Sequence, residues 1–156
     1  MRPKYTERYV SDLSANEKVL MAIVRAAENF KRTHTTIFRR HGLSFPQYNV
    51  LRVLDASQGG RNKISDIGRI MLVPGANMTG IAKRLERDGF LIRKSDPSDE
   101  RVTLLQITAK GKRTMENIKE EKDRITEKLL SGFSHKDKTE LLNRVKQLIK
   151  KNKLSS

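Results

Sequence analysis

Apolar residues recur at helical spacing along most of the chain, and caps and glycines divide this pattern into segments. Ser14 and Glu17 have the spacing of a capping box, and apolar residues then follow every three or four positions until Gly42. This pattern predicts one long amphipathic helix. A second cap at Ser44 and an early proline at Pro46 predict another helix, which ends at a run of glutamine and glycines that marks a loop.

Two short helices joined by a tight turn come after this loop. Residues 64–72 and 76–88 have helical patterns, residues 73–75 contain the proline and glycine of a turn, and Gly89 closes the second helix. At about 100° per residue, the apolar residues of the second helix share one face, which we assign to the core. These residues are Met78, Ile81, Ala82 and Leu85. The arrangement is typical of a helix-turn-helix.

Two β-like runs follow the second short helix. Residues 90–92 and 102–107 flank a polar stretch, 93–101, that has turn formers at its centre. They predict a β-hairpin with an exposed, charged tip. Thr108 then caps a helix whose apolar residues step by alternating threes and fours, a narrow seam suited to another helix. A glycine ends this helix, and Ser134 opens the last one.

The order helix, turn, helix, hairpin is that of a winged helix, in which the second helix enters the major groove of DNA. The predicted fold class is therefore mainly α with a small β-hairpin wing: a winged helix-turn-helix flanked by N- and C-terminal dimerisation helices. We expect an N-terminal dimerisation helix region at 1–42 and a winged helix-turn-helix DNA-binding domain at 43–108. The C-terminal dimerisation helices are expected at 109–156.

The chain is strongly basic. Its 156 residues include 33 lysines and arginines against 18 aspartates and glutamates, a formal net charge of +15. Such an excess attracts polyanions, so nucleic acid is the first partner to consider; a merely soluble basic surface is the alternative, and an acidic membrane surface comes third. No apolar run approaches the ~20 residues needed to span a bilayer, and the start of the chain has no apolar signal core. We therefore expect a cytoplasmic protein and no membrane partner.

Several classes of site are absent from the sequence. The chain has no cysteine, which excludes disulfides, thiolate metal sites and thiol-based redox sensing. His34, His41 and His135 do not form a metal-ligand spacing with carboxylates. The sequence also has no phosphate-cradling glycine loop, nucleophile elbow or zinc-protease helix. We therefore expect no enzyme, no cofactor and no metal.

The second helix of the predicted helix-turn-helix carries donors and small residues opposite its apolar face. Asparagine and arginine suit bidentate contacts with adenine and guanine, and threonine suits a thymine methyl, so Asn77, Thr79 and Arg84 are expected at bases. Lys83 and Arg87 are expected at phosphate oxygens. The full outward set is Ala76, Asn77, Thr79, Gly80, Lys83, Arg84 and Arg87. A solvated basic face is the alternative, and the adjoining hairpin favours DNA binding.

Three short motifs resemble those of a known family. They read Leu85-Glu86-Arg87-Asp88-Gly89-Phe90-Leu91, Asp99-Glu100-Arg101 and Ile107-Thr108-Ala109-Lys110-Gly111. In order and spacing, from Leu43 to Gly111, the chain resembles the MarR family of bacterial and archaeal regulators. Two departures prevent any transfer of base preference: Pro74 and Gly75 stand where the family favours Ser-Pro, and Gly80 replaces a longer polar side chain.

The resemblance implies an obligate homodimer whose first and last helices interlock and hold two winged helices on a palindromic operator. Two-fold symmetry would set the half-sites about one helical turn, roughly 34–36 Å, apart. It also implies that Arg101 of the wing lies near the minor groove and that Asp99 braces it through a charge-assisted pair; an exposed salt bridge of little worth is the alternative. Arg93 and Lys94 on the wing stem are expected at phosphates, or as a solvated strand end.

The resemblance further implies a small aromatic or phenolic effector. Many relatives sense such compounds in a cleft between the dimer helices and the winged helix. The candidate residues near that junction are His34, His41, Tyr48 and Arg52. A lone histidine on a long helix is otherwise a surface or core residue.

We therefore predict a sequence-specific double-stranded DNA-binding transcriptional regulator. Repression relieved by a small-molecule effector is the expected mode, because the family mostly blocks promoters; activation uses the same contacts and stays open. The alternative is a ligand-independent architectural or RNA-binding winged-helix protein. RNA recognition by stacking needs exposed aromatics, but aromatics make up 5% of the chain and none lies in the second helix.

Overall fold

The computed structural model describes residues 12–152, and its elements follow the predicted order. The helices are α1 (Ala15–Arg40), α2 (Phe45–Asp55), α3 (Ile64–Met71), α4 (Gly75–Arg87), α5 (Ala109–Leu129) and α6 (His135–Asn152). The strands are β1 (Arg61–Lys63), β2 (Leu91–Asp96) and β3 (Asp99–Ile107), and a short 3-10 turn covers Gln58–Gly60. The predicted class, a mainly helical winged helix-turn-helix with long helices on both sides, is confirmed.

Side-chain caps explain where the helices begin. The Ser14 hydroxyl accepts from the Glu17 N–H, and the Glu17 carboxylate accepts from the Ser14 N–H at 2.8 Å. Ser44 and Gln47 form the same reciprocal pair at the start of α2. The Thr108 hydroxyl accepts from the Gly111 N–H at 3.1 Å and so caps α5. Each cap satisfies a main-chain donor that the first helical turn leaves free.

The core lies where the two short helices, α2 and the sheet meet. Val50, Leu51 and Leu54 of α2 are fully buried. The four residues assigned to the inner face of α4, Met78, Ile81, Ala82 and Leu85, are buried as well. Phe90, just before β2, and Leu91, Leu105 and Ile107 of the sheet close this core. The inward face of α4 was thus predicted correctly, which fixes the outward face by elimination.

The sheet is larger than the predicted hairpin. Its three antiparallel strands are ordered β1-β3-β2, with Arg61 opposite Gln106 and Lys63 opposite Leu104. The sequence pattern predicted the hairpin but not β1, which is three polar residues that pair with a distant strand. The strands of the hairpin also run further into the polar stretch, so its tip is only Pro97 and Ser98.

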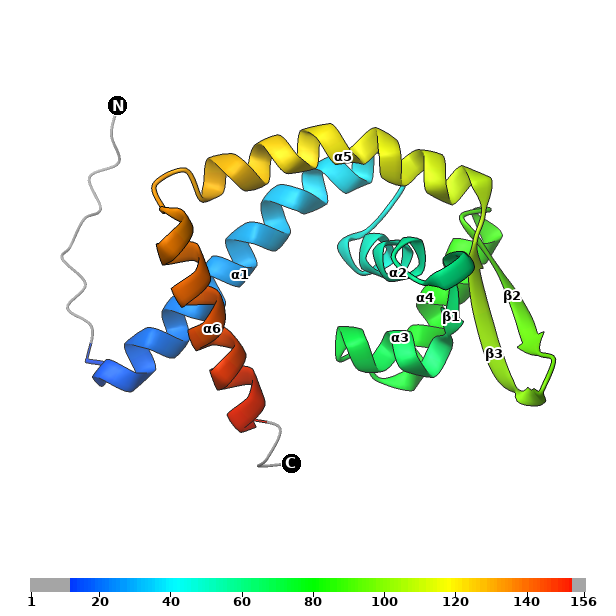
Figure 1. Cartoon of the computed structure of the whole chain (residues 1–156), viewed down its shortest axis with the longest axis horizontal. Coiled ribbons are helices and arrows are strands. Elements are labelled where there is room, and N and C mark those ends of the chain that lie inside the picture. The colour runs from blue at the N-terminus through cyan, green and yellow to red at the C-terminus, as the bar shows by residue number, and fades with distance from the viewer. Residues whose placement is uncertain (1–11, 153–156) are drawn as a thin grey trace.

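The molecule is an arch (Figure 1). Helix α5 runs from the β2–β3 hairpin, which we call the wing, to α6 at the other end of the molecule. The His34 ring joins α1 to α5 through the Thr126 hydroxyl, at 3.3 Å. An ion pair between Arg40 and Glu121 joins the same two helices. Helices α1 and α5 therefore form a common support that carries the winged helix at one end.

Many apolar side chains of this support, of α6 and of the turn between α5 and α6 face solvent. They are Val19, Leu20, Met21 and Val24 of α1, Leu129 of α5, Phe133, and Leu141, Leu142 and Ile149 of α6. Between 43% and 59% of each of these residues is exposed. Apolar patches of this kind mark interaction sites. Within residues 12–152, no helix combines the length and the apolar character needed to cross a membrane.

Candidate nucleic-acid interface

Helix α4 presents the predicted basic face to solvent. Ala76, Asn77, Thr79, Lys83, Arg84 and Arg87 are all exposed, and Gly80 is half-buried. Among the described residues, the side chains of Asn77, Lys83 and Arg84 have neither a hydrogen-bond partner nor an ion-pair partner. Their donors are free to bind another molecule without breaking a contact of the subunit.

The remaining polar residues of this face are already engaged. The Thr79 hydroxyl donates to the Gly75 carbonyl at 3.2 Å, which leaves its methyl group available to a base. The Arg87 guanidinium pairs with both carboxylate oxygens of Asp88, at 2.9 and 3.3 Å, and this contact lowers the pKa of Asp88. Arg87 therefore carries less free charge to a phosphate than Lys83 does.

The wing places Arg101 at its exposed end, but not through the expected ion pair. The Asp99 carboxylate accepts from the main-chain N–H of Arg101 at 3.0 Å. In the described part of the chain, no ion pair joins Asp99 to the Arg101 guanidinium. The expected charge-assisted brace is therefore corrected to a main-chain contact: Asp99 shapes the strand, and the Arg101 side chain is left free.

The two basic residues of the wing stem have partners within the subunit. The Lys94 ammonium group donates to the Gln106 side chain at 3.3 Å. The Arg93 Nε donates to Glu86 of α4 at 2.6 Å, and the Arg93 N–H donates to the other carboxylate oxygen at 3.1 Å. Arg93 was expected at a phosphate or as a solvated strand end; in the subunit, its side chain joins the wing to α4.

This contact also lowers the pKa of Glu86. The pKa of Glu86 lies below its ordinary value, chiefly because the Arg93 side chain donates to the carboxylate and secondly because the Arg93 N–H does so. Because the pKa is lower in the folded state, the pair stabilises the fold at neutral pH. This stabilisation is lost as the pH falls through the folded-state pKa.

The family-like motifs around Gly89 and Thr108 meet where the wing joins α5. The Thr108 hydroxyl donates to the Gly89 carbonyl at 2.7 Å, and the Thr108 N–H donates to the Phe90 carbonyl at 3.0 Å. The Lys110 ammonium group donates to the Asp88 carbonyl at 2.7 Å and lies 4.6 Å from the centre of the Phe90 ring. Sequence reasoning found these motifs but not their role, which is to hold the end of α4 and the start of the wing against α5.

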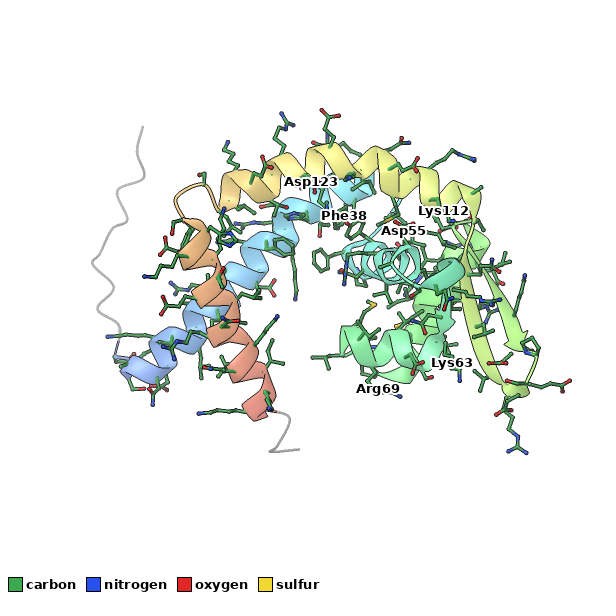
Figure 2. All side chains as sticks on the ribbon, viewed as in Figure 1. Phe38, Asp55, Lys63, Arg69, Lys112 and Asp123 are labelled. Atoms are coloured by element: carbon green, nitrogen blue, oxygen red, sulfur yellow. The ribbon has the colours of Figure 1, made fainter. Side chains whose placement is uncertain are left out.

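Three basic residues outside α4 and the wing were missed. Arg61 of β1 lines a small hollow of about 190 Å³ together with Lys94 of the wing. Figure 2 shows Lys63 and Arg69 on the side of the molecule away from α5, toward which the wing tip also points. Arg69 pairs with Asp66 at 3.3 Å. The charges of Arg61 and Lys63 could have been noticed, but their position depends on β1, which the sequence pattern did not reveal.

The four candidate effector residues are not brought together. His34 is buried, with its Nδ1 2.9 Å from the Phe30 carbonyl. Tyr48 is buried against Phe38, their rings stacked 3.8 Å apart, and this burial raises the pKa of its phenol. His41 caps the end of α1. Arg52 lines a cavity of about 330 Å³ between α1, α2 and the end of α3.

Comparison with known proteins shows a family match over the helix-turn-helix and the wing. The MarR family model matches residues 41–102, which span the helix-turn-helix and most of the wing. Over these residues the chain is similar to the MarR family. Its aligned part is 32% identical to the HTH-type transcriptional regulator TtmR of Methylorubrum extorquens, over 64% of this chain and 50% of TtmR. It is 29% identical to MhqR of Bacillus subtilis, over 82% of this chain and 89% of MhqR. The chain thus spans only about half the length of TtmR but most of MhqR.

Solved structures share the MarR fold. AbsC of Streptomyces coelicolor superposes with a TM-score of 0.83 at 18% identity, over 92% of this chain and 99% of AbsC. Sco3205 of the same organism, solved in complex with DNA, has a TM-score of 0.79 at 17% identity, over 93% and 92% of the two chains. The organohalide-sensing regulator RdhR, solved with 2,4-dichlorophenol bound, has a TM-score of 0.79 at 17% identity, over 94% and 88%.

Within the described residues, no group of three histidine, aspartate or glutamate side chains is placed to hold a metal ion.

Proposed function

We propose that this chain is a transcriptional regulator that binds a palindromic operator in double-stranded DNA as a homodimer. One observation carries the proposal: Asn77, Lys83 and Arg84 project from one exposed face of α4 with their donors unused, beside a wing that ends in Arg101. The major groove admits an α-helix, and such side chains read its base edges. The DNA complex of Sco3205, a protein with the same fold, supports this use of the fold. We place its action in the cytoplasm, where operator DNA lies.

The test is selection of duplexes from a random-sequence pool, followed by competition. We expect the protein to enrich one palindromic sequence and to bind it far more tightly than a scrambled duplex or single-stranded RNA of the same sequence. Affinity should fall steeply with salt, because bound lysines and arginines release counterions. Equal binding to all duplexes, or stronger binding to the RNA, would instead support the architectural or RNA-binding alternative.

The dimer is proposed from the apolar faces of α1 and α6. Leu141, Leu142 and Ile149 lie on one side of α6 and are 47–52% exposed, so a single subunit leaves them in water. A two-fold interface uses the same patch on both subunits and would cover these faces. It would also hold two winged helices at a fixed separation for the two half-sites.

Leu142→Glu is expected to prevent dimerisation. The side chain is 52% exposed in the subunit, and a carboxylate there would be buried without a partner in the dimer. We expect a monomer by sedimentation velocity and roughly 100-fold weaker operator binding, because the second half-site no longer adds its contribution. Gln147→Glu adds the same charge to the opposite side of α6 and should remain dimeric. A dimeric Leu142→Glu protein would contradict the proposed interface.

We also propose that a small aromatic acid relieves repression by binding in the cavity beside Arg52. The cavity has two cationic side chains among apolar ones, a combination that suits an aromatic ring with a carboxylate. Its lining residues are Lys31, Phe45, Pro46, Asn49, Arg52, Met71 and Val73. The cavity lies between the long helix α1 and the turn before α4, so a bound molecule can shift the position of α4. RdhR, which shares the fold, was solved with a phenol bound.

Arg52→Ala is expected to abolish the response to benzoate, the simplest aromatic carboxylate. In the unsubstituted protein, saturating benzoate should weaken operator binding about tenfold, a coupling of ordinary size. Arg52→Ala should bind DNA normally without benzoate and ignore its addition. Arg39→Ala removes an exposed arginine outside the cavity and should respond normally. Equal benzoate responses in both variants would place the effector elsewhere.

A further inference from the structure

An ion pair within the subunit, between Glu86 and Arg93, joins α4 to the wing. Arg93 lies only seven positions after Glu86, and between them Gly89 adopts a left-handed conformation with φ of +80°. Across this bend, Glu86 uses one carboxylate oxygen for the Arg93 N–H and the other for the Arg93 Nε. A single carboxylate therefore fixes both the backbone and the side chain of the wing stem.

The Glu86–Arg93 pair lies where it can fix the angle between α4 and the wing. In the proposed complex, α4 occupies the major groove while the wing reaches the adjoining backbone and minor groove. Both elements can bind at once only if the angle between them is held. Phe90 and Leu91 anchor the bend from the inner side, where both are buried. The Glu86–Arg93 pair, with each side chain about one third exposed, holds it from the outer side.

The charges of the pair make a role in direct phosphate contact unfavourable. Glu86 lies next to Arg87 near the carboxyl end of α4, where a carboxylate opposes the helix dipole and repels a polyanion. The Arg93 guanidinium neutralises that charge, and its Nε–H is occupied by the carboxylate in doing so. If Arg93 turned to a phosphate, the Glu86 carboxylate would be left uncompensated close to the DNA.

We propose that Glu86 and Arg93 are a positioning pair that locks the wing to the recognition helix, and that Arg93 acts on DNA binding through Glu86 and not through a phosphate. This inference rests on the proposed DNA-binding function. The two roles considered for Arg93 predict opposite effects of the Glu86 carboxylate on DNA affinity. As a positioning residue, Glu86 supports binding although it is negative; as a mere neighbour of a phosphate-binding arginine, it weakens binding.

The experiment compares Glu86→Gln, Arg93→Gln and the double variant on a duplex that the unsubstituted protein has selected. We expect each single variant to bind that duplex about tenfold more weakly, which corresponds to about 1.4 kcal/mol. The double variant should bind no more weakly than either, because one contact is lost in all three. Hydroxyl-radical footprints should lose the protection given by the wing and keep that given by α4. Salt dependence should not change.

Control variants separate positioning from simple charge. Glu100→Gln removes an exposed carboxylate of β3 close to the wing tip and should tighten binding to every duplex. Arg93→Lys keeps the charge but not the paired geometry, so it should still lose wing protection. Melting curves of all variants identify any that fail to fold. If a glutamine variant fails to fold, the Arg93→Lys footprint tests the positioning role in its place. Tighter binding by Glu86→Gln, or a lower salt slope in Arg93→Gln with full binding by Arg93→Lys, would overturn the inference. If the unsubstituted protein selects no duplex, the proposed function fails instead.

Discussion

Gly111→Ala is expected to destabilise the protein by about 2–3 kcal/mol, the upper range for overpacking a filled site. A Cβ atom at position 111 would meet the Phe90 carbonyl oxygen at 2.4 Å and the Ile107 side chain at 2.6 Å. The first of these is backbone, held by the hydrogen bond from the Thr108 N–H, so it cannot turn aside. The start of α5 must then move away from the wing. We expect the melting temperature to fall by about 5–10 °C.

Gly80→Ala is the matched control, since it makes the same change inside another helix. There the nearest atom to an added Cβ is the far end of Arg84, at 3.8 Å. The methyl group is tolerated, and replacing a helical glycine gains up to about 1 kcal/mol of stability. The two variants should therefore shift the melting temperature in opposite directions. A Gly111→Ala protein with the same melting temperature as the unsubstituted protein would contradict the packing described for this junction.

The double substitution Asn77→Ala with Arg84→Ala is expected to weaken binding to the selected duplex by about 100-fold. Each side chain can make a bidentate contact with a base, and losing one such contact costs about 1–3 kcal/mol of discrimination. Both side chains are exposed and unpaired, so their removal leaves the fold unchanged. Binding to a scrambled duplex should change much less, because bases are not read there.

Lys83→Ala is the control for charge on the same face of α4. It should weaken selected and scrambled duplexes alike and lower the salt slope by about one unit. Fluorescence anisotropy at several salt concentrations measures both effects. If Lys83→Ala and the double variant behave identically, the division of α4 into base-reading and phosphate-binding residues is wrong.

The parts of this fold that depend on local chemistry were predictable from the sequence. Ser14, Ser44 and Thr108 each cap a helix with their own side chains, so the starts of α1, α2 and α5 are encoded within one turn of the chain. The inward face of α4 follows from helical periodicity alone, as the burial of Met78 and Leu85 confirms.

The parts that depend on distant contacts were not predictable. Strand β1 has three polar residues, and it exists because Arg61 pairs with Gln106 more than forty positions later. The Glu86–Arg93 pair needs the left-handed bend at Gly89 to bring both oxygens into reach. Tyr48 looks like a ligand-binding residue in the sequence, but its ring is buried against Phe38. In each case, a tertiary contact decides what the residue does.

The most direct test of the account is hydrogen–deuterium exchange of the protein with and without a duplex that it has selected. If α4 and the wing bind DNA, amides in Gly75–Arg87 and Leu91–Ile107 should gain protection, while those of α6 should exchange at the same rate in both samples. Protection confined to α5 and α6, with α4 and the wing unchanged, would contradict the claim that these two elements form the nucleic-acid interface.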